Sequence, residues 1–219
     1  MALICWFILT FLLGVLNSTM TYMLIDLHKI DESKATLVTL ITRFSFVLGT
    51  PILNVLLDRK WLTRLQLIQL GIIMQAISFI MRSGTLIDVD EPNLITTCSS
   101  MLVGGIGMAF IMIPFLPEAY NSLEVQPEIK NGVREEEMKA YISKMQVLIG
   151  GIAQGIAMFF GQLMIQTTGY LTTYLICACL AFMVAFSYYL LCGIENPENL
   201  KLEDPSYVQL SQSEPKKTE

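Results

Sequence analysis

The sequence predicts an all-α membrane protein: one bundle of six transmembrane helices within residues 1–192, followed by a polar tail at 193–219. Three observations predict this class. Hydrophobic residues make up 53% of the 219 residues and charged residues only 15%, whereas soluble domains carry about 25% charged residues. The apolar residues gather in runs of about 17–25, a helix length that crosses a ~30 Å hydrocarbon core. No acidic residue lies inside these runs.

The ends of the apolar runs predict the spans in order. Asp26 ends the first run, Asp58 the second and Arg82 the third. Pro114 and Pro117 are expected to end the fourth, because proline disrupts a helix interior. The predicted spans are residues 2–25, 35–57, 65–81, 94–115, 140–166 and 171–192. Spans one to three and four to six are expected to form a 3+3 inverted repeat, since three is an odd number of crossings.

Two soluble pieces remain between and after the spans. Residues 118–139 are predicted to form an acidic loop whose last residues open the fifth helix, where acids favour the positive end of the helix dipole. The tail at 193–219 is polar and poor in aromatic residues, so it is expected to be disordered unless something holds it.

Basic residues in the short loops predict the orientation of the bundle. Loops on one side carry more basic residues than loops on the other, which carry Lys29, Lys34 and Arg82. The richer side holds Arg59, Lys60, Arg64, Lys130, Arg134, Lys139, Lys201, Lys216 and Lys217. The bias places both termini and the acidic loop on the cytoplasmic side, or on the matrix side of a mitochondrial membrane.

The charged turn after the second span resembles a signature of the major facilitator superfamily of transporters. The stretch from Asn54 to Arg64 is similar to G-x-L-x-D-[RK]-x-G-x-[RK]-[RK], with Asp58, Arg59 and Arg64 matching. Asn54 and Trp61 stand where that family has glycines, which favours the degraded copy in its second half. The resemblance implies a hinge whose charges latch one conformer. The alternative is a solvated basic turn without that role.

Glycines extend the resemblance to the fourth and fifth spans. Gly104 and Gly107, followed by Gly151 and Gly155, are similar to helices ten and eleven of the vesicular-amine and drug-antiporter branch. The resemblance therefore covers helices seven to twelve, and implies a second six-helix half supplied elsewhere. Small residues spaced in this way let helices pack closely. Ordinary packing, with no moving part, is the equal alternative.

Arg43 is the residue that points most directly to a binding site. It lies about 12 Å into the second span by helical rise, where an arginine costs ~2.5–3.5 kcal/mol on insertion scales. We expect it to face a central cavity and an anionic substrate; the alternative is that its side chain extends to the membrane surface. Asn17, Gln146 and Gln154 are further cavity candidates, although such residues also join helices by hydrogen bonds.

Two functions follow as hypotheses. The first is half of a major-facilitator-like transporter that moves a small organic solute by alternating access with a second six-helix half, from another chain or a second copy. The second is a non-transporting accessory subunit of a larger membrane complex. The sequence shows no catalytic set, metal-ligand spacing, cofactor motif or nucleic-acid motif, so we expect no enzyme, no metal, no cofactor and no nucleic acid, and partners limited to lipid and membrane proteins.

Overall fold

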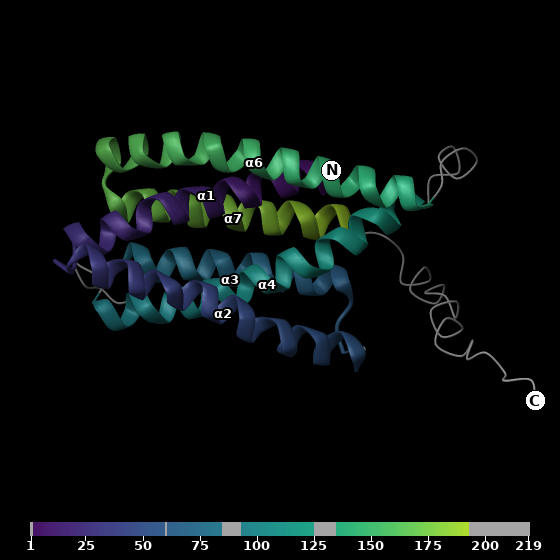
Figure 1. The fold of residues 1–219 in the computed structure, drawn as a ribbon, viewed down its shortest axis with the longest axis horizontal. Coiled ribbons are helices and arrows are strands. Elements are labelled where there is room, and N and C mark those ends of the chain that lie inside the picture. Colours follow the sequence, from purple (N-terminus) through teal and green to yellow (C-terminus); the bar gives the residue numbers. More distant parts are fainter. Residues whose placement is uncertain (1, 60, 85–92, 125–134, 193–219) are drawn as a thin grey trace, which may run out of the picture.

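The computed structural model describes residues 2–59, 61–84, 93–124 and 135–192. The regular elements among these residues are α-helices, and six of them are each long and apolar enough to cross a membrane. The helices lie side by side along the long axis of the molecule (Figure 1). The chain is therefore built as an integral, multi-pass membrane protein. The tail predicted at 193–219 lies outside the described residues.

Six helices follow one another in alternating directions. Their bounds are α1 (Ala2–Asp26), α2 (Glu32–Asp58), α3 (Arg64–Ser83), α4 (Leu94–Glu124), α6 (Glu135–Thr168) and α7 (Tyr170–Cys192). Each overlaps one predicted span, because the length of an apolar run sets the length of a membrane helix.

The end of α4 differs from the expectation. Pro114 and Pro117 lie inside the helix, which continues to Glu124 rather than ending near Phe115. Each proline removes one backbone hydrogen bond, but neighbouring helices and small local adjustments make this tolerable in a membrane helix. The loop predicted at 118–139 is correspondingly shorter, since α6 begins at Glu135; residues 125–134 lie outside the described part.

The start of α3 is capped by its own side chains. The Thr63 hydroxyl accepts a hydrogen bond from the Gln66 backbone N–H at 3.3 Å, and the Gln66 side chain accepts one from the Thr63 N–H at 3.0 Å. This reciprocal capping box satisfies two backbone donors that a helix start would otherwise leave free. It fixes where the chain turns from α2 into α3.

Replacing Thr63 with alanine is expected to lower the stability of the bundle by about 1 kcal/mol, since the cap is lost. Unfolding in mixed detergent micelles, followed by far-UV circular dichroism, measures this change. Thr167→Ala is the matched control, because the exposed Thr167 hydroxyl donates to the Leu163 and Met164 carbonyls of its own helix and caps no helix start. Equal losses in the two variants would contradict a capping role for Thr63.

The helices pack in a definite pattern. α4 lies along both α2 and α3, α1 lies along α6, and α3 lies along α7. In Figure 1, α2 and α6 occupy opposite edges of the bundle. Buried side chains form one cluster around Trp6 and Phe115 at the end where α1 begins, and another around Phe79 and Tyr174 at the opposite end. The ends of the bundle are thus closed by different sets of residues.

Candidate functional site

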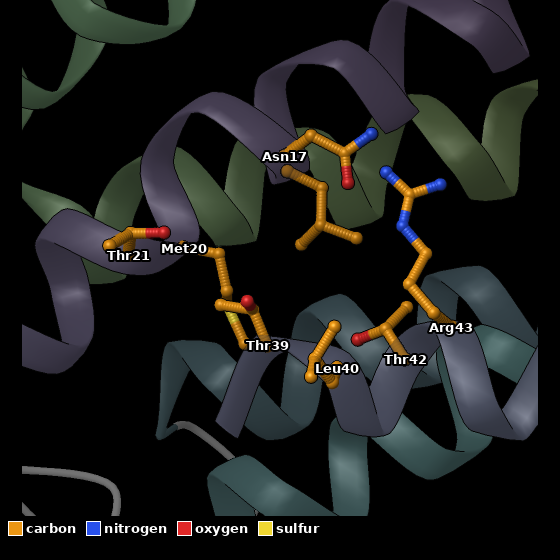
Figure 2. A pocket seen from close by; sticks show the side chains of 8 residues that line it. Asn17, Met20, Thr21, Thr39, Leu40, Thr42 and Arg43 are labelled. Carbon is orange, nitrogen blue, oxygen red and sulfur yellow. The ribbon is translucent and has the colours of Figure 1, made fainter. Parts of the chain in front are cut away.

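A pocket opens between α1 and α2. Its volume is about 150 Å³, and Figure 2 shows polar side chains from both helices around it. It is lined by Leu16, Asn17, Met20, Thr21, Thr39, Leu40, Thr42 and Arg43. The pocket exists because α1 is packed against α6 and α2 against α4, so the two helices touch each other only slightly.

Arg43 faces this pocket from α2. Figure 2 shows its guanidinium reaching toward the amide of Asn17 on α1. Arg43 lies about 16 Å along α2 from Glu32 by helical rise, near the middle of a ~30 Å core. The side chain is exposed in this chain, and no described carboxylate forms an ion pair with it. The pocket therefore offers a cation and an amide to a ligand at mid-membrane depth.

The glutamines of α6 lie elsewhere. The Gln146 backbone carbonyl accepts a hydrogen bond from Trp6 Nε1 at 3.0 Å, and the Gln154 backbone packs beside Gly14. Neither residue lines the pocket that holds Arg43. Gln162, which lies further along α6, donates a hydrogen bond through Nε2 to the Ser18 carbonyl at 3.2 Å. In this chain α6 therefore uses these positions to hold α1.

The hinge residues surround the turn between α2 and α3. Asn54 and Asp58 are exposed, and Arg64 is the first residue of α3. The Arg59 guanidinium lies 5.4 Å from the centre of the Trp61 ring, a cation–π contact. The ion pair of Lys34 with Asp31 lies at the opposite end of the bundle from this turn. Within this chain, the described hinge residues thus do not form a network of ion pairs.

The four glycines singled out in the sequence fall into two environments. A Cβ on Gly104 would lie 2.7 Å from Ser78 Oγ, and one on Gly107 would lie 2.9 Å from Met74 Cβ, so both sit tightly against α3. Nothing lies within 4 Å of the corresponding position on Gly151 or Gly155. Gly151 and Gly155 therefore form an exposed strip on α6 that no other described helix of this chain contacts closely.

Sequence reasoning missed Arg82, which was expected in a loop beyond the third span. Its side chain is fully buried, and Nε, Nη1 and Nη2 have no hydrogen-bond partner in the described part of the chain. A signal was present: Gln75, Ser78 and Arg82 recur at helical spacing, so they lie on one face of α3. All three are buried. A polar stripe thus runs inside the bundle along α3.

Comparisons with protein-family models, curated proteins and solved structures found no match for this chain. The fold and the pocket therefore define the class of protein by themselves. It is a multi-pass helical membrane protein with a small, partly polar pocket between α1 and α2.

Proposed function

We propose that this chain is one six-helix half of a major-facilitator-like transporter, which moves a small anionic organic solute by alternating access together with a second six-helix half. The observation that carries the proposal is a matched set of close contacts at two helix crossings. Such a match is expected when the first three helices and the last three are inverted copies of one unit.

The first crossing joins α1 to α6. A Cβ on Gly14 would lie 2.6 Å from Ala157 Cβ and 3.0 Å from Gln154 Cα. One on Gly161 would lie 3.0 Å from Ser18 Oγ and 3.4 Å from Val15 Cα. Thr19 Cγ2 would also lie 3.4 Å from the Cβ on Gly161. Each helix thus contributes a glycine that lies against residues of the other.

The second crossing joins α4 to α2 in the same way. A Cβ on Gly105 would collide with the Thr42 carbonyl and would lie 2.5 Å from Ser45 Cβ. One on Gly49 would lie 3.0 Å from Ala109 Cβ and 3.2 Å from Ile106 Cα. The Phe46 backbone nitrogen would also lie 3.1 Å from the Cβ on Gly105. Here too each helix contributes one glycine that lies against residues of its neighbour.

The two crossings share one register. In α1, two of the residues that contact the glycine of α6 lie one and four positions after Gly14. In α4, the residues that contact the glycine of α2 lie one and four positions after Gly105. In α6, Gly161 lies four positions after Ala157, which contacts Gly14. In α2, Gly49 likewise lies four positions after Ser45, which contacts Gly105. The paired positions are Gly14 with Gly105, Val15 with Ile106, Ser18 with Ala109, Gln154 with Thr42, Ala157 with Ser45, and Gly161 with Gly49.

Burial follows the same pairing. The share of the apolar segment that is buried inside the bundle is high in both α1 (61%) and α4 (56%) and low in both α2 (17%) and α6 (22%). It is intermediate in both α3 (44%) and α7 (39%). Helices that are matched by register are thus matched in exposure. This agreement supports the 3+3 repeat, and leaves α2 and α6 as the faces available to lipid or to a second half.

The pocket fits half of a transport site. Its volume of about 150 Å³ is smaller than the ~300–1,000 Å³ typical of complete ligand pockets, as expected if a second half encloses the solute. Arg43 is a cation without a described counter-ion, and an intramembrane charge needs one. A carboxylate or similar anionic group on the solute would supply it, with Asn17 as a hydrogen-bonding neighbour.

Uptake into proteoliposomes tests the proposal. The protein is purified with the chains that accompany it and given a panel of radiolabelled mono- and dicarboxylates. Arg43→Ala is expected to reduce the initial rate by about tenfold or more, because a charge-assisted contact is lost. Lys34→Ala is the matched control, since its exposed ammonium pairs with Asp31 outside the pocket. No uptake of any probe, or equal uptake by Arg43→Ala, would overturn the proposal.

The second candidate is an accessory subunit that keeps the fold without transporting. It is favoured by the hinge, where Asn54 and Trp61 replace glycines of the signature and the exposed Asp58 forms no ion pair with a described residue. Co-purification with unrelated membrane subunits, together with no uptake of any probe, would select this role. For either role we propose that the termini and the hinge share the cytoplasmic or matrix side.

A further inference from the structure

Arg82 adopts an unusual direction for a basic residue near the end of a membrane helix. A long basic side chain at such a position normally reaches outward to the interface. Here the guanidinium lies back along α3, 5.9 Å from the centre of the Phe79 ring. It also lies beside α4, since a Cβ on Gly104 would be 3.5 Å from Nη2. The charge is thus directed into the bundle, and its side chain is fully buried.

The surrounding groups do not satisfy this charge. Nε, Nη1 and Nη2 all lack a hydrogen-bond partner among the residues that the structure describes. The Ser78 hydroxyl donates to the Ser100 carbonyl at 2.8 Å, and the Tyr174 hydroxyl pairs with Thr19 Oγ1 at 3.1 Å. The last turn of α3 offers a favourable dipole, but no hydrogen bond to these nitrogens. A buried charge without a partner is strongly unfavourable, so the site calls for a counter-ion.

We propose that Arg82 is the centre of a buried binding site for a monatomic anion, a halide such as chloride. A single negative charge matches one guanidinium, which can direct several N–H groups at the same ion. The full burial of the guanidinium argues for a small ion, since a monatomic anion needs less room beside it than an organic one. The neighbouring crossing with α4 is itself close, because a Cβ on Gly104 would lie 3.5 Å from Arg82 Nη2.

A second unsatisfied atom lies on the same face of α3. Gln75 donates through Nε2 to the Gly104 carbonyl at 2.7 Å, while its Oε1 is buried without a partner. Oε1 is an acceptor, so it repels an anion and would instead take a hydrogen bond from water. We therefore expect the anion to lie beside the Arg82 guanidinium and a water molecule to lie beside Gln75 Oε1. It is separate from the Arg43 pocket, which Arg82 does not line.

Thermal unfolding of the purified protein in detergent tests the site. Sodium chloride is compared with sodium gluconate at equal ionic strength. Chloride is expected to raise the midpoint with the logarithm of its concentration, by roughly 3–5 °C for each tenfold increase above the dissociation constant. Arg82→Gln should abolish the response and Arg43→Gln should keep it. A response that survives Arg82→Gln, or that is lost only in Arg43→Gln, would overturn the assignment.

The wild-type protein provides a test that does not depend on a variant folding. Bromide is expected to compete with chloride, and its anomalous X-ray scattering in crystals of the protein should place an ion beside the Arg82 guanidinium. Identical midpoints in chloride and gluconate, with no bromide at that position, would overturn the proposal. Because the Arg43 uptake assay probes a different pocket, either proposal can fail while the other stands.

Discussion

Trp6→Ala is expected to destabilise the bundle by about 3 kcal/mol, at the lower end of the range for removing a buried tryptophan. Trp6 is 5% exposed, and its ring stacks on Phe115 with centroids 4.5 Å apart. Its Nε1 donates to the Gln146 carbonyl, so one side chain joins α1, α4 and α6. We expect the lower end of that range because helices that separate in detergent remain in an apolar medium. The substitution then costs the packing contacts of the ring but little hydrophobic free energy.

The chain contains one other tryptophan, which serves as the control. Trp61 is 65% exposed, so Trp61→Ala is expected to change stability by about 0.5 kcal/mol or less. Trp6→Phe should recover most of the packing and cost about 1 kcal/mol for the lost hydrogen bond. Denaturation in mixed micelles, read by far-UV circular dichroism, compares the three variants. Similar losses for Trp6→Ala and Trp61→Ala would contradict the packing described for Trp6.

Gly105→Ala is expected to cost about 1–3 kcal/mol, because the added methyl group would overpack the crossing of α2 and α4. Its Cβ would meet the Thr42 carbonyl and Ser45 Cβ, and backbone atoms cannot move aside without shifting a helix. If the repeat is correct, Gly14→Ala at the matched position should cost a similar amount, since it meets Ala157 Cβ at 2.6 Å.

Gly151→Ala and Gly155→Ala are the controls for these two substitutions. Nothing lies within 4 Å of the added carbon at either position, and alanine favours a helix over glycine by about 1 kcal/mol. Both are therefore expected to leave stability unchanged or to raise it when the chain is measured alone. A loss only when accompanying chains are present would indicate that the strip on α6 contacts a partner. Equal losses at Gly105 and Gly151 would refute the crossing geometry.

The sequence alone was sufficient to predict the helices. Spans near α1, α2, α3 and α7 followed from apolar run length, because a membrane helix must be long enough to satisfy its backbone across the hydrocarbon core. The end of α4 was wrong for a local reason. Pro114 and Pro117 indicate a helix end in water, but a membrane helix keeps its remaining backbone hydrogen bonds and continues.

The candidate sites were only partly predictable. Arg43 and Asn17 were both singled out from their charge, polarity and depth, and the structure places both at one pocket. Gln146 and Gln154 were grouped with them, but helical periodicity says only which face a residue occupies and not which helix that face meets. The structure turns that part of α6 toward α1.

What the sequence determined by itself is the membrane class and the number of described helices, since these depend on run length and rise per residue. The tertiary structure decided which glycines are contacts, which crossings match and which arginine is enclosed. Arg82 and Arg43 are chemically alike, yet one is buried and the other exposed. Packing between helices depends on rotation and crossing, which bring together residues far apart in the chain and which no single segment encodes.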